Sequence, residues 1–419
     1  MHKRTFLKTA ATLTLGAPAL LNALDYHLGK VPSTEPEALA ANEDFWASVR
    51  ADYRLPTDYI NLENGYYCLL PEPTLEAYLG HLRQLNYENS RYLRTVQFEN
   101  KNRMRTKLAE LAGVAPENVI ITRNTTESLN TVISGYPWQE GDEAVMAAQD
   151  YGAMLDMFGQ VAKRYGTVNR RVSVPLHPVS DAEIVETYAR AITPRTKLLM
   201  VCHLINITGQ VLPVRKICDM AHARGVEVMV DGAHSFAQLD FNLPELDCDY
   251  FGTSLHKWLS VPLGTGMLYI RPEKTEKIWP LFPEHEPPKN DLLRLNHTGT
   301  HPCATDLAIA DAIDYYRHLG AARKEARLRY LRRYWTERVR ELEHVSINTP
   351  AAPERACAIA NVGVTTLTPH ELAERLFTDY RIWTVAIDGA GVHGVRITPN
   401  VYTSTEELDV LVRALGEMG

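Results

Sequence analysis

The sequence predicts an α/β protein in which a mostly parallel sheet lies between helices, with a smaller α+β domain at the carboxyl end. Between residues 117 and 257, short apolar runs with the length of buried strands alternate with segments of helical periodicity. The connections between them are only a few residues long, which is typical of parallel strands joined by right-handed crossovers. With 419 residues, the chain is long enough for two domains.

Composition and charge narrow the range of partners. The net charge is −7 and no basic stripe with interleaved aromatic residues is present, so we expect no nucleic-acid partner. The six cysteines stand singly and show neither metal-ligand spacing nor the density of a disulfide scaffold. No HExxH or CxxC motif occurs, so we also expect no protein-bound metal.

Residues 1–25 have the pattern of an export leader. A basic start is followed by an apolar run at residues 10–21 and by small residues that suit cleavage. Residues 3–8 resemble the twin-arginine export motif, with Lys3 where the first arginine is expected. The apolar run is too short to span a bilayer comfortably, so we expect no membrane span. An exported, periplasmic protein is therefore predicted, with a cytoplasmic protein as the alternative.

Residues 26–58 form a polar amino-terminal segment, and the larger domain is expected over residues 59–290. Residues 59–67 fit a short strand and a glycine turn, which either faces a pocket or is simply the entry turn of the domain. In chain order we expect helices at residues 44–53, 75–86, 102–112, 125–134, 154–165, 181–192 and 214–224, and strands at residues 119–122, 144–148, 169–174, 197–202, 226–230, 250–254 and 263–271, the last one returning antiparallel.

Three of these strands end beside residues that suit a flat, phosphorylated ligand. The strand at 119–122 passes directly into a helix, whose unpaired N–H groups attract an anion and whose Thr125 and Thr126 can add hydrogen bonds. Tyr151 and Asn206 follow two other strands, where a ring can stack on a cofactor and an amide can bind a phenolic oxygen. The alternatives are an ordinary helix N-cap and two loop residues without a role.

The strands at 226–230 and 250–254 carry the central pair of ionisable residues. The first ends in Asp231, and the second is followed by Lys257. Ligands of open α/β sheets bind at the carboxyl ends of the strands. Pyridoxal phosphate chemistry needs this pair, because a lysine forms a Schiff base with the aldehyde and a carboxylate keeps the pyridine nitrogen protonated. The alternative is a pair of solvated residues at strand ends.

The smaller domain is expected over residues 291–419, after a proline-rich stretch. It begins with a long helix at residues 305–318 and a basic helix at residues 323–342, whose charges we expect to form a solvated face. Further strands are expected at residues 356–364, 384–387 and 394–397, with helices at residues 369–377 and 405–415.

Seven short motifs occur in the order in which class V aminotransferases carry them. They are Asn124-Thr-Thr-Glu, Asp150-Tyr-Gly-Ala, His203-x-x-Asn, Asp231-Gly-Ala-His, Ser254-x-His-Lys, Gly299-Thr and Val395-Arg-Ile. From about Asn61 to the carboxyl terminus, the chain therefore resembles this family of fold-type I pyridoxal phosphate enzymes, and most closely its isopenicillin N epimerase-like branch. The resemblance implies a large domain with a mostly parallel, seven-stranded sheet and a small α+β domain.

The resemblance also implies roles for single residues. Lys257 holds pyridoxal 5′-phosphate, Asp231 pairs with its pyridinium nitrogen, and Arg396 binds the substrate carboxylate through a bidentate fork. The remaining implied contacts are Asn206 and His234 at the ring oxygen, Tyr151 stacked on the ring, Thr125, Thr126, Ser254 and His256 at the phosphate, and Thr300 at the phosphate of the neighbouring subunit. The last contact implies a homodimer with shared active sites.

The reaction implied by the resemblance is epimerisation or racemisation at the α-carbon of a small, amino-acid-like substrate. The alternatives are a C–S lyase or an aminotransferase on the same cofactor, and a non-catalytic binding module of the same fold. A cysteine desulfurase of the usual design needs a nucleophilic cysteine shortly before the carboxylate arginine, and residues 378–395 contain none. Cys303 is expected to be a packed residue at a helix start. No second acid–base group can be assigned from the sequence.

Overall fold

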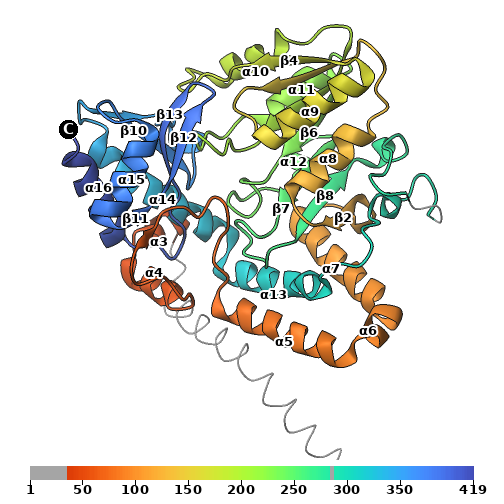
Figure 1. Ribbon diagram of the computed structural model, residues 1–419, viewed down its shortest axis with the longest axis horizontal. Coiled ribbons are helices and arrows are strands. Elements are labelled where there is room, and N and C mark those ends of the chain that lie inside the picture. The colour runs from red at the N-terminus through yellow and green to blue at the C-terminus, as the bar shows by residue number, and fades with distance from the viewer. Residues whose placement is uncertain (1–34, 284–286) are drawn as a thin grey trace, which may run out of the picture.

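The computed structural model describes residues 35–283 and 287–419, and it arranges them as two main sheets with their covering helices and one additional two-stranded sheet (Figure 1). The larger sheet comes from the middle of the chain, and the smaller sheet from its carboxyl-terminal part, drawn in blue. Within the described ranges, no helix is long and apolar enough to cross a membrane. The predicted export leader at residues 1–25 lies outside the described residues and stays a prediction.

The larger sheet has seven strands in the order β2-β8-β7-β6-β5-β3-β4. They are β2 (Val119–Thr122), β3 (Glu143–Ala147), β4 (Val168–Val172), β5 (Thr196–Cys202), β6 (Glu227–Asp231), β7 (Tyr250–Ser254) and β8 (Gly266–Ile270). Neighbouring strands are parallel except at the two edges of β8, which is antiparallel to β2 and β7. The predicted mostly parallel, seven-stranded sheet with one returning strand is therefore confirmed.

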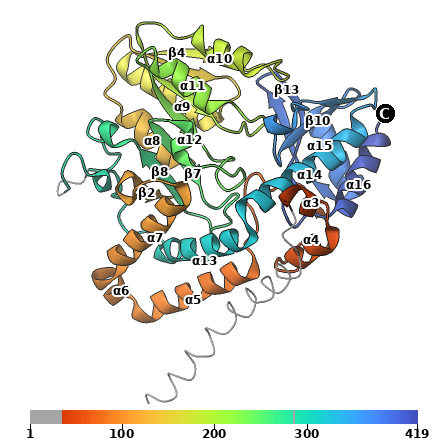
Figure 2. The same cartoon turned by 180° about the vertical axis from the view of Figure 1, so that it is seen from behind.

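Helices bury both faces of this sheet, as parallel crossovers require. Successive residues of β5 alternate between two hydrophobic clusters: Leu198 and Met200 belong to one, and Leu199 and Val201 to the other. The first cluster includes side chains of α8 (Thr125–Gly135) and α9 (Gly152–Tyr165), and the second includes side chains of α7 (Gln97–Ala112), α10 (Asp181–Ala189) and α11 (Val214–His222). Figure 2 shows the same layers from behind.

The smaller sheet is antiparallel and has the strand order β12-β13-β10-β9. Its elements are β9 (Val345–Ile347), β10 (Ala360–Val364), β12 (Val385–Gly389) and β13 (Val392–Ile397), and helices α14 (Ala321–Val339), α15 (Pro369–Tyr380) and α16 (Thr405–Gly416) share its hydrophobic core. This arrangement confirms the predicted α+β fold of the carboxyl-terminal part. The predicted domain limits at residues 59 and 290 stay predictions.

The amino-terminal segment folds back onto the carboxyl-terminal part. The short strand β1 (Ile60–Asn61) pairs in parallel with β11 (Ile382–Trp383), and α4 (Glu43–Arg50) is joined to α16 by an ion pair of 2.7 Å between Arg50 and Glu407. The chain therefore crosses between the two sheets twice. It crosses once after β1 and once where α13 (Cys303–Leu319) meets α14 at Gly320, whose φ of 88° lies in the left-handed region.

The remaining α-helices lie outside these layers. They are the short α3 (Pro36–Ala40) beside α14, the pair α5 (Glu72–Glu88) and α6 (Ser90–Thr95), and the one-turn α12 (Leu243–Leu246). Helix α13 packs against α5 and α7; in Figure 1, α5 and α13 run side by side below the sheet, and α7 rises from α6 towards β2.

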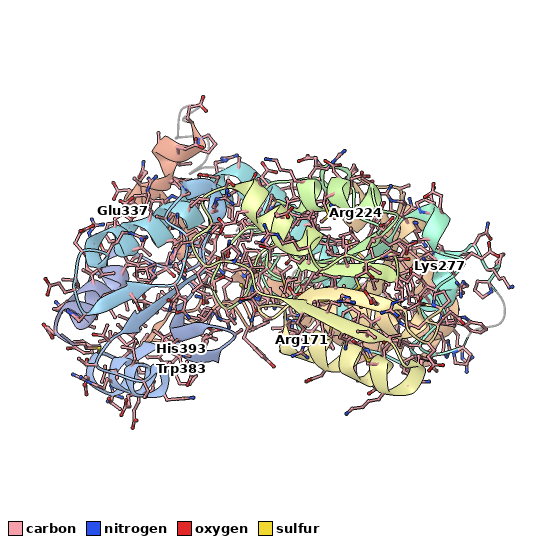
Figure 3. The ribbon with its side chains drawn as sticks, turned by 90° about the horizontal axis from the view of Figure 1, so that it is seen from above. Arg171, Arg224, Lys277, Glu337, Trp383 and His393 are labelled. Carbon is pink, nitrogen blue, oxygen red and sulfur yellow. The ribbon has the colours of Figure 1, made fainter. Side chains whose placement is uncertain are left out.

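The basic helix α14 departs from the expected solvated face. Glu337 is exposed (Figure 3), but Lys324, Arg327 and Arg332 are buried. The Arg327 guanidinium donates to both carboxylate oxygens of Glu43, at 2.5 and 3.0 Å, and to backbone carbonyls of the segments that cover it. The expectation is wrong for these three residues: the segment with Ala40 and Glu43 covers Arg327, and Lys324 and Arg332 donate to the backbone carbonyls of Trp258 and Pro350. Buried cations are tolerated where their N–H groups are paired in this way.

Candidate active site

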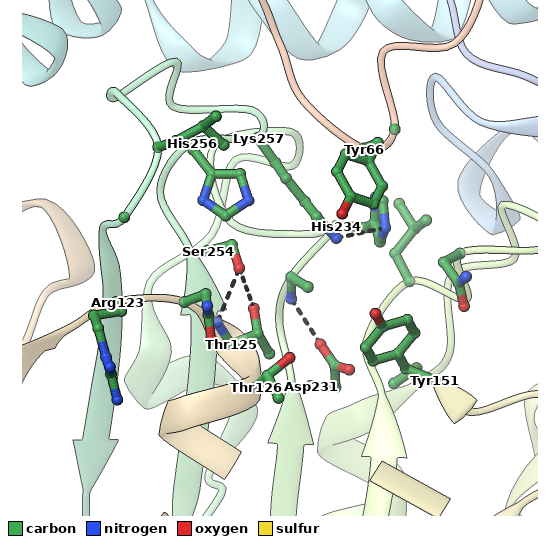
Figure 4. A pocket seen from close by; sticks show the side chains of 18 of the residues that line it. Tyr66, Arg123, Thr125, Thr126, Tyr151, Asp231, His234, Ser254, His256 and Lys257 are labelled. Carbon is green, nitrogen blue, oxygen red and sulfur yellow. Dashed lines mark hydrogen bonds between the residues drawn. The ribbon is translucent and has the colours of Figure 1, made fainter. Parts of the chain in front are cut away.

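A cavity of about 420 Å³ opens at the carboxyl ends of β5, β6 and β7 and at the start of α8 (Figure 4). Its volume lies in the range of small-molecule sites. Ten of the eleven residues predicted for the site line it: Thr125, Thr126, Tyr151, Asn206, Asp231, His234, Ser254, His256, Lys257 and Arg396. Thr300 does not line this cavity and is exposed. Its predicted partner is a neighbouring subunit, so its role stays a prediction.

Asp231 places a buried carboxyl group at the end of β6. Its side chain is 5% exposed, and Oδ1 accepts a hydrogen bond of 2.9 Å from the backbone N–H of Ala233. Burial raises the pKa of Asp231, while the Ala233 N–H and the charge of Lys257 act in the opposite direction. A carboxylate in this position gains most from a nearby cation such as a protonated ring nitrogen.

Lys257 lies just beyond the end of β7, and its Nζ is 3.0 Å from Nε2 of His234. Burial lowers the pKa of Lys257 to about 8; Asp231 opposes this effect and Arg396 adds to it. Burial and the charge of Lys257 also hold the pKa of His234 well below its usual range. Both groups are therefore held towards their neutral forms.

The indole of Trp258 determines how His234 is protonated. Its Nε1–H lies 3.4 Å from Nδ1 of His234, and an indole nitrogen can only donate. Nδ1 is then the acceptor, and a neutral imidazole carries its proton on Nε2, facing the amine of Lys257. This tautomer is assigned from the hydrogen-bond partners. Only the neutral amine can accept from it, so the contact favours the free base of Lys257.

The start of α8 forms a pocket for an anion. Ser254 Oγ accepts from the backbone N–H of Thr125 at 2.9 Å and lies 2.7 Å from Thr125 Oγ1. Asn124 is the N-cap, and its side chain accepts from the backbone N–H of Glu127. The helix N-cap and the anion site are therefore compatible, because the Asn124 side chain caps the helix while the hydroxyl groups of Thr125, Thr126 and Ser254 remain at the cavity wall. Helix dipole and hydroxyls together suit a phosphate.

Two buried polar atoms in the cavity wall have no hydrogen-bond partner within the protein. They are Oδ1 of Asn206 and Nδ1 of His256. Burial and the neighbouring Lys257 lower the pKa of His256 to about 4, so its neutral ring has an acceptor to offer. Unsatisfied buried atoms are costly unless a ligand completes them. With a carboxylate, a lysine and an anion site in one cavity, these atoms fit the predicted pyridoxal 5′-phosphate.

Arg396 reaches the cavity from β13, but its guanidinium is already paired. Nε donates to Glu63 Oε2 at 3.1 Å, Nη2 donates to Glu63 Oε1, and Nη1 donates to the backbone carbonyl of Asn206 at 3.3 Å. Sequence reasoning missed Glu63, because the pairing of β1 with β11 that brings it here joins segments over 300 residues apart. The interpretation of residues 59–67 as pocket-facing holds for Gly65 and Tyr66, which line the cavity.

The six cysteines are all buried. Burial raises the pKa of Cys202, which lines the cavity, well above its usual range, and raises that of Cys68 to about 12. Cys303 is the first residue of α13, as expected, and burial raises its pKa too. A reactive cysteine needs the opposite change. Among the residues that the structure describes, no cluster of His, Cys, Asp or Glu could hold a metal ion.

Comparisons with known proteins identify the family. The profile of the aminotransferase class-V family matches residues 68–411. An isopenicillin N epimerase from Amycolatopsis lactamdurans is 30% identical over 397 residues, which cover 89% of this chain and 98% of the relative. A cysteine desulfurase from Haloferax volcanii is 27% identical over 392 residues, covering 86% and 89%.

A solved structure shows the same fold. The complex between the cystine C–S lyase C-DES and its reaction product cysteine persulfide superimposes with a TM-score of 0.78 at 24% identity, over 87% of this chain and 98% of that one. Because the family profile matches more than half of the chain, the protein belongs to the class V aminotransferase family.

Proposed function

We propose that the protein moves the proton at the α-carbon of an amino acid or amino-acid-derived substrate, as an epimerase of the isopenicillin N epimerase type. The observation that carries this proposal is the state of Lys257. Its amine lies 3.0 Å from His234, and burial lowers its pKa to about 8. A base with a pKa near the working pH is suited to taking up and returning a proton.

Pyridoxal 5′-phosphate is the cofactor of this family, and the cavity fits it. When bound, it supplies the electron sink that weakens the bonds at the substrate α-carbon. The residues of the chain bind and orient this cofactor: Asp231 would pair with its ring nitrogen, and Ser254 with the start of α8 would bind its phosphate. Lys257 carries the α-proton, and Arg396 orients the substrate through its carboxylate.

The thiols favour an epimerase over a cysteine desulfurase of the usual design. Such an enzyme needs a nucleophilic cysteine, and all six thiols of this chain are buried. Residues 378–395, which precede Arg396, contain no cysteine. The identity of 30% to an isopenicillin N epimerase supports the same choice.

A C–S lyase is the second candidate. The identity of 27% to a cysteine desulfurase favours it, and elimination of a leaving group from Cβ needs only the α-proton to be removed. The buried thiols restrict this candidate to lyases that need no cysteine nucleophile. An aminotransferase remains the third candidate, because it needs the same proton transfer followed by reprotonation elsewhere.

Incubation with amino acids in heavy water separates the three reactions. An epimerase introduces solvent deuterium at Cα with loss of optical purity. A lyase releases a keto acid with sulfide or ammonia, and an aminotransferase leaves the amine on the cofactor. The purified protein is expected to show a visible absorbance band that borohydride removes, and Lys257→Ala is expected to lose it. An unchanged band in that variant contradicts the assignment of the lysine.

We also propose that two copies associate around the active sites, with Thr300 reaching the phosphate site of the other copy. Large apolar side chains are exposed around the cavity, including Tyr66 and Leu263 in its lining. Light scattering after gel filtration tests the association. A monomer at micromolar concentration with full cofactor content contradicts it.

For the leader at residues 1–25 we propose export in the folded state. Fractionation of the native host tests this proposal. A shortened protein in the periplasm supports it, and full-length protein confined to the cytoplasm contradicts it.

A further inference from the structure

The guanidinium of Arg396 is occupied by a carboxylate of its own chain. The side chains of Arg396 and Glu63 are 9% and 8% exposed, and they form a side-on, two-point ion pair through Nε and Nη2. This is the geometry in which an arginine normally holds a ligand carboxylate. Glu63 thus occupies the position at which a substrate carboxylate is expected.

The backbone holds Glu63 in this place. Glu63 forms a parallel bridge with Thr398, two residues beyond Arg396 on the same stretch of chain. The hydroxyl of Thr398 accepts from the backbone N–H groups of Asn64 and Gly65, at 2.6 and 3.1 Å. These contacts place the backbone of Glu63 beside that of Arg396, so that the two side chains meet.

Gly65 lies against the guanidinium of Arg396. A Cβ atom at this position would lie 2.9 Å from Cζ of Arg396, so a larger residue here would displace the guanidinium or the loop. The neighbouring backbone N–H of Tyr66 donates to Glu63 Oε1 at 3.1 Å. Glu63 consequently holds two groups at once: the arginine and the segment that carries Tyr66 to the cavity wall.

The hydrogen-bond donors of Arg396 show what a substrate would find. A guanidinium has five N–H donors. Glu63 takes two of them and the Asn206 carbonyl takes a third, which leaves one N–H on each terminal nitrogen. A second carboxylate at these two donors would lie close to Glu63 in a buried site, where like charges repel. Full two-point binding of a substrate carboxylate therefore requires Glu63 to leave.

We infer that Glu63 is an internal competitor for Arg396, and that it determines which carboxylate substrates the site accepts. The inference rests on the proposed role of Arg396 as the carboxylate anchor. A substrate carboxylate binds by displacing Glu63, which also releases the Tyr66 segment. Small amino acids with few other contacts are therefore bound weakly, whereas a substrate with additional contacts to the cavity displaces Glu63 more readily.

Glycine and its amide test the inference, because they carry the same amine and differ only in the carboxylate. Their affinities for the holoenzyme are measured from the change in the visible band of the bound cofactor. In Glu63→Gln, which keeps the size of the side chain but removes its charge, glycine is expected to bind about tenfold tighter while glycinamide changes by less than about twofold. Glu63→Asp is expected to give an intermediate glycine affinity.

Glu407→Gln is the matched control. Glu407 forms a two-point ion pair with Arg50 at 2.7 and 2.8 Å, away from the cavity lining, so this variant should leave both affinities unchanged. Circular dichroism establishes that each variant is folded.

Equal or weaker glycine binding by Glu63→Gln overturns the inference, because it means that Glu63 orients Arg396 for the substrate. Failure of the proposed function gives a different result. If the protein is not an epimerase, no amino acid exchanges its α-proton with solvent, but the ratio of the glycine affinity to the glycinamide affinity still changes in Glu63→Gln.

Discussion

Lys257 is expected to react readily with an aldehyde near neutral pH. Burial lowers its pKa from the usual 10.5 to about 8. At pH 7 the neutral fraction then rises from about 1 in 3,000 to about 1 in 11, which is roughly a 300-fold gain. Because only the neutral amine attacks an aldehyde, the apoprotein should take up pyridoxal phosphate with a pH dependence that reflects this change.

The assay follows the visible band as apoprotein and cofactor combine between pH 6 and pH 10. A short peptide with one lysine serves as the reference, because ionisation of pyridoxal phosphate affects its reaction and that of the protein equally. The Lys257→Ala variant shows the rate at which all other amines react. The rate for the protein is expected to rise about tenfold for each pH unit and to level off near pH 8. The rate for the peptide should continue to rise up to pH 10.

Two variants test the physical causes of the lowered pKa. Asp231 raises the pKa of Lys257 and Arg396 lowers it, so Asp231→Asn should move the midpoint of the profile below that of the wild type, and Arg396→Gln should move it above. If the profile of the wild-type protein runs parallel to that of the peptide up to pH 10, Lys257 behaves as a solvated amine and the reasoning from burial is refuted.

Three further variants test other parts of the structure. Ser254→Ala removes the acceptor of the Thr125 N–H, and should lower the unfolding free energy of the apoprotein in urea by about 1–3 kcal/mol; a change below about 0.5 kcal/mol contradicts this role. The Arg170 guanidinium lowers the pKa of Glu143 from 4.5 to about 2, so this ion pair stabilises the fold above pH 4.5 and is lost as the pH falls towards 2. Glu143→Gln should therefore lose less stability than the wild type between pH 5 and pH 2, by about 1–3 kcal/mol in urea titrations, and parallel losses would falsify the assignment. Gly65→Ala should displace the Arg396 guanidinium and weaken glycine binding about tenfold with the visible band retained, because a misplaced anchor loses its two-point contact; unchanged binding shows that the loop yields instead.

The sequence predicted those features of the site that depend on local structure. The strand β6 is short and mostly apolar and ends at Asp231, so a few neighbouring residues are enough to predict both the strand and the ionisable residue at its carboxyl end. The same holds for β7 before Lys257 and for the turn from β2 into α8. Because the carboxyl ends of parallel strands meet at one edge, correct strands were enough to bring these residues together.

Features that depend on pairing of distant segments could not be predicted in this way. Glu63 reads as an ordinary turn residue, and its contact with Arg396 follows from a two-residue strand that pairs with another two-residue strand. Arg327 reads as part of a solvated basic face, because its partner Glu43 lies 284 residues away along the chain. The pattern of residues 323–342 indicates a helix, but it does not show which distant segment covers Arg327.

The two crossings of the chain between the sheets have a mechanical consequence. A body tethered at two points turns most easily about the line that joins them, and here such a turn also has to break the bridge between Gln210 and Ala356. Arg396 and Glu63 lie on one side of this line with the smaller sheet, and Lys257 lies on the other side with the larger one. Such a rotation carries Arg396 and the backbone of Glu63 together and alters the distance from Arg396 to Lys257. The separation between the amine and the carboxylate of a bound molecule then sets the angle at which the enzyme closes.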